Sequence, residues 1–219
     1  MLVATQLSGF GIGGAALSSL SQAASATSTA ATITGPAGIL AGDLLVLWDT
    51  AESVGSVPTT VVPTGFAVIS NLDNGSSNRT LLSAKIADGS EASAALTGMN
   101  GDSANRKSLY VFRGNTPITT YVANDVGEET TTGDPTAQTC NASGGTVPLV
   151  VIGAYRALAA IDPRTFTVGG SPAKDGEINP ATTSYLAYKI YNTAPADVVI
   201  DMDDEGARQF LVSCYLACT

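Results

Sequence analysis

Histidine is absent from this chain of 219 residues. Its absence removes the commonest general base, the Ser-His-Asp and Cys-His nucleophile systems, and the usual zinc ligand. The three cysteines, Cys140, Cys214 and Cys218, are an odd number without metal-site spacing, which predicts buried free thiols. These absences favour a protein that is not an enzyme and holds no cofactor.

Basic residues are also few. The chain has 10 Lys and Arg against 19 Asp and Glu, a formal charge of -9, and no base precedes Arg79. Nucleic-acid binders need clustered Lys and Arg to neutralise phosphates, so we expect no nucleic-acid partner. No apolar run approaches the roughly 20 residues of a membrane helix, and no positively charged signal segment opens the chain. We expect a soluble protein made in the cytoplasm, without membrane insertion.

What the chain does contain is a series of short apolar runs. A hydrophobic fraction of 44% with 13% charged residues predicts a folded protein. Glycine, proline and turn pairs such as Asn74-Gly75 and Asp88-Gly89 separate runs rich in β-branched and aromatic residues. The runs are 44–48, 66–70, 80–86, 108–112, 119–123, 147–152, 183–191, 197–202 and 209–216. This spacing predicts an all-β fold, a jelly-roll-like β-sandwich of two Greek-key halves.

The run LLVLW at 44–48 predicts a central strand that is covered on both faces. Trp48 ends it, which favours a core position over a sugar platform. The run TSYLAYKIY at 183–191 alternates, which predicts one wetter face.

The chain repeats itself after about one hundred residues. LLVLWDTAES at 44–53 aligns with LVVIGAYRAL at 149–158, and Leu82-x-x-Lys85-Ile86 aligns with Leu186-x-x-Lys189-Ile190. Met99 and Met202 follow at a similar offset, as do Leu109–Phe112 and Leu211–Cys214. Chance similarity between apolar strands is the alternative.

These patterns suggest a domain organisation. Residues 1–35, rich in Ala, Ser and Thr, are expected to form an arm or an edge strand. Residues 36–219 are expected to form a single β-sandwich domain, with two possible halves at 36–125 and 140–219. Glu128 and Glu129 are assigned to a polar linker between the halves.

Three local patterns are candidate sites. Gly9–Gly14, GFGIGG, resembles a dinucleotide loop but lacks the following helix and acidic residue, so a turn-forming segment is favoured. Asp201, Asp203 and Glu205 have the spacing of a calcium loop without its closing Glu, and a solvated acidic hairpin loop is the favoured interpretation over a Ca2+ site. Tyr155 and Arg156 are candidate glycan contacts, with a hydrogen-bonded structural tyrosine as the alternative.

Four segments carry a resemblance to a known family: PAGILAGDLLVLWDTAES at 36–53, PTGFAVIS at 63–70, LLSAKIADGSE at 81–91 and SLYVFRG at 108–114. Together they resemble bacteriophage and prophage virion proteins with the pattern PAG-x-x-AGDLLV, K-x-ADGSE and VFRG. The chain departs from that pattern at Phe66, where the family usually has Trp, and at Ser83-Ala84, where aromatic residues are frequent. The resemblance covers most of the chain and has no catalytic motif to transfer.

The resemblance implies a jelly-roll β-sandwich in a non-enzymatic virion structural protein at the virion surface, made in the host cytoplasm. We expect a head-surface decoration or cement protein that forms a homo-oligomer, for example a trimer, and binds other virion proteins such as the major capsid protein or tail proteins. The alternative is a tail or fibre-associated adhesin that binds a host surface glycan.

Overall fold

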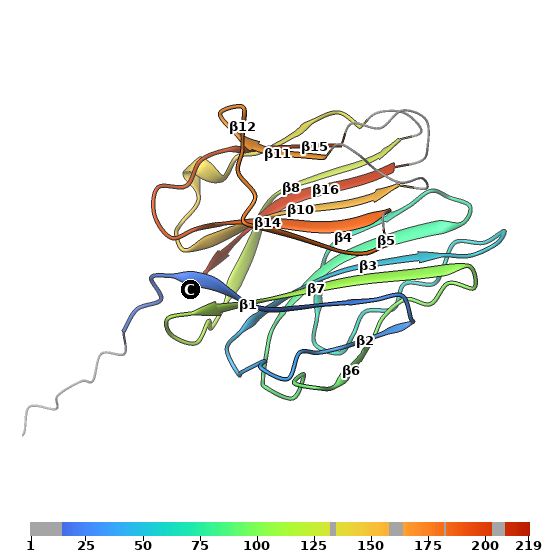
Figure 1. Cartoon of the computed structure of the whole chain (residues 1–219), viewed down its shortest axis with the longest axis horizontal. Helices are drawn as coiled ribbons and strands as arrows, with labels where there is room; N and C mark the ends of the chain where they lie inside the picture. Colours follow the sequence, from blue (N-terminus) through green and yellow to red (C-terminus); the bar gives the residue numbers. More distant parts are fainter. Residues whose placement is uncertain (1–14, 132–134, 158–163, 182, 203–208) are drawn as a thin grey trace, which may run out of the picture.

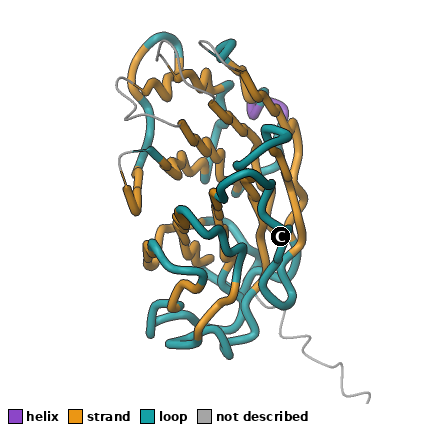
Figure 2. Tube along the Cα trace, turned by 90° about the vertical axis from the view of Figure 1, so that its right-hand side faces the viewer, coloured by secondary structure: helices purple, strands orange, loops and turns teal. Residues whose placement is uncertain are grey.

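The computed structural model describes residues 15–131, 135–157, 164–181, 183–202 and 209–219, whose regular secondary structure is almost entirely β-strand (Figure 1). The strands of the first half are β1 (Leu20–Ser28), β2 (Thr32–Thr34), β3 (Leu44–Glu52), β4 (Ala67–Asp73), β5 (Asn78–Ile86), β6 (Ala95–Thr97) and β7 (Ala104–Gly114). Those of the second half are β8 (Tyr121–Thr131), β9 (Gln138–Cys140), β10 (Leu149–Ala157), β11 (Arg164–Val168), β12 (Ser171–Pro172), β13 (Gly176–Ala181), β14 (Ser184–Tyr191), β15 (Val198–Met202) and β16 (Gln209–Cys218). Within the described part of the chain, the single helical segment is a short 3-10 turn at Ala142–Gly144 (Figure 2).

The strands form four stacked layers, visible from top to bottom in Figure 1. The first large sheet has the order β1-β7-β3-β5-β4, and the second large sheet has the order β13-β14-β10-β16-β8. The first small sheet, β2-β6, covers the outer face of the first large sheet, and the second small sheet, β12-β11-β15-β9, covers that of the second. The predicted all-β sandwich is confirmed.

The two halves have the same strand order. The first large sheet pairs its strands as β1-β7-β3-β5-β4, and the second reads β8-β16-β10-β14-β13 in the matching direction. The small sheets also correspond, because β2 pairs with β6 as β9 pairs with β15. Each half therefore repeats one pairing scheme, and the two large sheets pack against each other across the central core.

Register shows how the repeat aligns in space. If the Lys-bearing strands β5 and β14 are matched at Lys85 and Lys189, their pairings make Leu44 equivalent to Val150. The sequence alignment, which matched Leu44 with Leu149, is therefore displaced by one residue. Because side chains alternate between the faces of a strand, that displacement changes the face: Leu44 lies in the central core and Leu149 lies in an outer core.

The strand β3 shows why LLVLW contains no polar residue. It lies between β5 and β7, and every residue from Leu44 to Ala51 is buried. The prediction of a central strand covered on both faces is confirmed. The alternating run at 183–191 does not have the predicted wetter face along its length. β14 is buried from Ser184 to Tyr188 and becomes half-buried only at its end.

Small residues suit β1 and polar residues suit β8, because both are edge strands. Of the alternatives for the N-terminal segment, the structure forms an edge strand over Leu20–Ser28, paired with β7. Glu128 and Glu129, assigned to a linker, lie instead in β8 opposite Val212 and Leu211. The second sheet thus begins at Tyr121, earlier than the predicted boundary between the halves.

The central core lies between the large sheets and joins the halves. Tyr188 of β14 packs edge-on against Tyr110 and Phe112 of β7, with ring centroids 4.7 and 5.1 Å away. Trp48 is fully buried, and its Nε1–H donates to the carbonyl oxygen of Tyr155 at 3.2 Å. The core position predicted for Trp48 is confirmed, and this hydrogen bond links β3 to β10.

Candidate functional site

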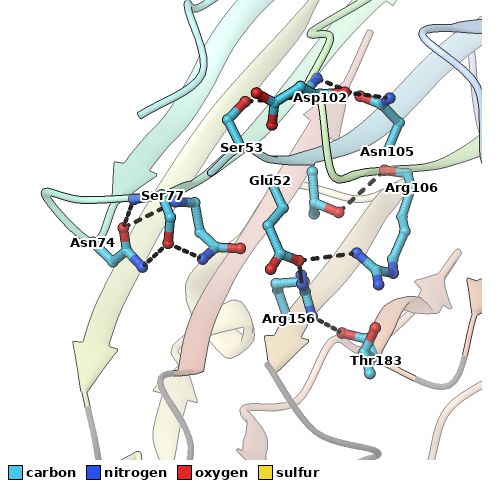
Figure 3. Close-up of polar contacts among 12 residues, drawn as sticks. Glu52, Ser53, Asn74, Ser77, Asp102, Asn105, Arg106, Arg156 and Thr183 are labelled. Atoms are coloured by element: carbon cyan, nitrogen blue, oxygen red, sulfur yellow. Dashed lines mark hydrogen bonds and ion pairs between the residues drawn. The ribbon is translucent and has the colours of Figure 1, made fainter. Parts of the chain in front are cut away.

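A polar cluster closes one end of the space between the large sheets (Figure 3). Glu52 ends β3, Arg106 lies near the start of β7 and Arg156 lies near the end of β10. Arg156 is 2% exposed, its NH2 group lies 3.1 Å from Glu52 Oε2, and its NH1 group donates to the Thr183 carbonyl oxygen at 3.3 Å. Arg106 NH1 approaches the same Glu52 oxygen at 3.8 Å.

The charges of this cluster hold the halves together. Burial, and then the nearby Arg106 guanidinium, lower the pKa of Arg156 to about 10, and Glu52 opposes that shift. Arg156 is therefore still charged at neutral pH, and Glu52 supplies the compensating charge from the other half. The cluster is a polar bridge between β3 and β10.

Short turns surround this bridge (Figure 3). The Ser53 hydroxyl accepts the Asp102 amide at 3.2 Å, and Asn74 Oδ1 accepts the Ser77 and Asn78 amides at 2.8 and 2.9 Å. Such side-chain hydrogen bonds satisfy backbone amides where a strand ends and the hydrogen bonds between strands stop. Asn74-Gly75 is the turn between β4 and β5, as its sequence predicts, with Gly75 at a φ of 71°.

The candidate glycan contacts Tyr155 and Arg156 are both buried. Tyr155 is 1% exposed and its hydroxyl donates to the Thr165 carbonyl oxygen at 3.3 Å. A sugar has no access to either side chain, so the glycan interpretation of this pair is wrong. The open alternative, a hydrogen-bonded structural tyrosine, describes Tyr155.

The segments that carry the family resemblance meet at one corner of the first half. The Asp43 carboxylate accepts hydrogen bonds from Arg113 Nε at 2.8 Å and from Arg113 NH2 at 2.7 Å. These two bonds form a bidentate ion pair that joins the PAG-x-x-AGD segment to the VFRG segment. Asp43 also accepts the Leu40 amide at 2.8 Å. Its backbone carbonyl accepts the amide of Ala87, which opens the ADGSE segment, at 2.7 Å.

Glycine is required at this corner. Gly42 has a φ of 86°, and a Cβ atom there would lie 2.5 Å from the side chain of Pro117. Other residues rarely adopt that backbone conformation. The residues of the segments that carry the family resemblance thus fix the path of the chain between β3, β5 and β7.

A groove of about 470 Å³ lies along the ADGSE segment. Its polar wall is formed by Lys85, Asp88, Ser90 and Glu91, and Val62 and Leu96 contribute apolar surface. Lys85 pairs with the buried Glu91 and with Asp88 at 3.3 Å. The Glu91 bond, followed by the weaker Asp88 bond, helps to raise the pKa of Lys85.

We expect Ser90→Ala to raise the pKa of Asp88. Hydrogen bonds from the Ser90 side chain and amide, and then Lys85, lower this pKa to about 2. Because the folded-state value lies below the ordinary 3.8, Asp88 contributes stability above pH 3.8 that is lost as the pH falls through about 2. An NMR titration of the Asp88 carboxyl measures the shift. Ser25→Ala, on exposed β1, is the control that leaves Asp88 unchanged.

Another ion pair, which the sequence did not predict, is completely buried. Asp49 of β3 and Lys107 of β7 are direct cross-strand partners, both with 0% of the side chain exposed. Lys107 Nζ lies 2.5 Å from Asp49 Oδ1 and donates to the Met99 carbonyl oxygen at 2.8 Å. Burial raises the pKa of Asp49 and lowers that of Lys107, although each partner opposes the other's shift.

The three cysteines are buried and unpaired, as predicted. Burial raises the pKa of Cys140 and of Cys218 to about 12 and raises that of Cys214 further. Thiolates are the reactive form, so an aromatic disulfide reagent at pH 8 is expected to leave the native protein unmodified. After denaturation in urea it should modify all three thiols per chain. Immediate reaction of one thiol in the native protein would contradict this burial.

The calcium candidate lies mostly outside the described residues. Asp203 and Glu205 are not described, and neither is the segment Gly9–Gly14. Asp201 lies on β15. Among the residues that the structure describes, no group of three or more Cys, Asp or Glu is placed to hold a metal ion.

The same part of the chain contains no helix long and apolar enough to cross a membrane. Comparison of the chain with protein-family models, curated proteins and solved structures finds no match.

Proposed function

We propose that this protein is a structural component of a bacteriophage virion, a non-enzymatic decoration or cement protein of the head surface that forms a homo-oligomer. The observation that carries the proposal is the corner formed by Asp43, Arg113 and Ala87. Segments that are distant in sequence and share a pattern with virion proteins bond to one another there. The shared pattern therefore corresponds to this corner of the fold, which supports an architecture in common with those virion proteins.

The distribution of polar contacts also supports a structural role. The Glu52–Arg156 pair joins the halves, and Asp49–Lys107 joins two strands of one sheet. Edge strand β8 exposes Val122 and Val126, at 58% and 42%, beside the open side of the second large sheet. An exposed edge with apolar side chains is a surface that other chains cover in assemblies.

Electron microscopy of the parent virion, labelled with an antibody against this protein, tests the proposal. We expect label at lattice positions over the whole head. Label confined to the tail tip or fibres would reject the head position, and purified virions without the protein would reject the virion role. An antibody against the major capsid protein gives the reference pattern.

The groove beside Lys85 favours a second candidate function, that of a tail or fibre-associated adhesin that binds a host glycan. Its charged and hydroxyl groups are of the kind that hydrogen-bond sugars, and Val62 and Leu96 add apolar surface to its lining. Saturable binding of host polysaccharide, weakened by Lys85→Ala and unchanged by Lys189→Ala on the second half, would support the adhesin. Absence of binding would exclude it.

A further inference from the structure

The buried Asp49–Lys107 pair occupies a place that the second half fills with uncharged side chains. With the halves matched at Lys85 and Lys189, Asp49 is equivalent to Tyr155 and Lys107 to Leu211. Both sets are direct cross-strand pairs on the outer face of a large sheet. This architecture therefore accepts an uncharged pair, Tyr155 and Leu211, at the position where the first half has a buried carboxylate and a buried amine.

A buried ion pair is a poor way to gain stability. Removing two charges from water costs as much as their attraction returns, and apolar residues of similar volume often serve equally well. The neutral amine and neutral carboxylic acid avoid that cost, and burial shifts both pKa values toward those forms. The pair thus needs an explanation other than the strength of a salt bridge.

Met99 places both groups for a reaction between them. Its amide donates to Asp49 Oδ2 at 2.8 Å, and its carbonyl accepts Lys107 Nζ at 2.8 Å. The remaining carboxyl oxygen, Oδ1, is the atom 2.5 Å from Nζ. Gly98 packs directly against the pair, because a Cβ atom there would collide with Asp49 Oδ2 and lie 3.1 Å from Lys107 Nζ, and both side chains are 0% exposed.

We propose that Lys107 Nζ and Asp49 Cγ are joined by an intramolecular amide bond, which links β3 covalently to β7. The product would keep the contacts now seen. Its carbonyl oxygen, the former Oδ2, would accept the Met99 amide, and its N–H would donate to the Met99 carbonyl oxygen. One backbone residue thus satisfies both polar groups of the link.

The reaction needs no further reactant. The lone pair of neutral Nζ attacks Cγ of the protonated carboxyl group, and the Met99 amide stabilises the charge that develops on Oδ2. The Cγ–Oδ1 bond then breaks. Nζ gives up one proton and the carboxyl group supplies another, and both leave with Oδ1 as one water molecule. Carbon and nitrogen keep their oxidation states.

Intact mass measurement of the denatured, purified full chain tests the proposal. We expect a mass about 18 Da below that of the sequence, the mass of one water. Proteolysis should yield one branched peptide that contains Asp49 and Lys107, in place of the two linear ones. Lys85, which pairs with the buried carboxylate of Glu91 but keeps 14% of its own side chain exposed, should be recovered in a linear peptide and is the internal control.

Two variants and one chemical control make the result specific. Lys107→Arg keeps the charge without a nucleophilic amine and is expected to show the full sequence mass. Asp49→Asn would lose ammonia, about 17 Da, in place of water. Cyclisation at Asp88-Gly89 also releases water, but hydroxylamine cleaves that product and leaves the branched peptide intact.

The full sequence mass for the wild-type chain, with linear peptides for both residues, would overturn the proposal. This measurement needs no variant to fold. A mass deficit that maps to another residue would overturn it equally.

Discussion

Replacing Lys107 by alanine is expected to lower the free energy of unfolding by about 3–5 kcal/mol at pH 7. The loss arises because Asp49, with 0% of its side chain exposed, keeps its place in the core without its partner. Urea denaturation followed by circular dichroism measures it. A loss below about 1 kcal/mol would mean that the buried pair is unimportant for stability.

The size of this loss should depend on pH. Without Lys107, burial holds the pKa of Asp49 above its ordinary 3.8 with less opposition. A group whose folded-state pKa is raised contributes stability that is present below the unfolded value and is lost as the pH rises through the folded value. The deficit of Lys107→Ala should therefore be smallest near pH 4 and increase toward pH 8.

A double variant separates the lost partner from the lost packing. Asp49→Leu with Lys107→Met fills the same space with apolar groups, and for a pair without a covalent bond it would recover most of the stability. If the amide bond forms, both variants also lose the entropic effect of closing a 58-residue loop, about 4 kcal/mol by analogy with a disulfide. The double variant would then recover only in part, in agreement with the mass measurement.

Trp48→Ala is expected to cost about 3–5 kcal/mol, because it opens a cavity between the two halves. Trp48 is fully buried in the central core, and its Nε1–H bond to Tyr155 crosses from one half to the other. Chemical denaturation followed by circular dichroism measures the change.

The control for this substitution is Val54→Ala. Val54 is 80% exposed, and its truncation should change stability by less than about 0.5 kcal/mol. Equal effects of the two substitutions would contradict the central-core position of Trp48. Separate unfolding transitions for the halves in Trp48→Ala would show that this core couples them.

The sequence predicts the strands well where burial is two-sided. LLVLW identifies β3 because a central strand covered on both faces has no polar positions. The edge strands were harder. In β1 the residues are small and mostly half-buried or exposed, and in β8 the carboxylates of Glu128 and Glu129 resemble those of a solvated loop.

The polar sites were less accessible to sequence reasoning. Asp49 and Lys107 are 58 positions apart, and nothing in the sequence near Lys107 distinguishes its charge from a solvated one. Only the register of β3 against β7 brings them together. The sequence suggests Arg156 as a glycan contact, yet its position on β10 turns the side chain inward to Glu52. An acid in the middle of LLVLWDTAES, on a strand with no other charge until Glu52, was the one available signal.

The matched halves resemble a symmetric dimer whose two subunits have become one chain. In a true twofold interface the same residue is contributed twice, so a bulky side chain near the axis meets its own copy. Here Trp48 corresponds to Ala154, the residue next to the carbonyl that the indole contacts. Within one chain the two equivalent positions carry different residues, so the large indole of one half packs where the other half has only a methyl group.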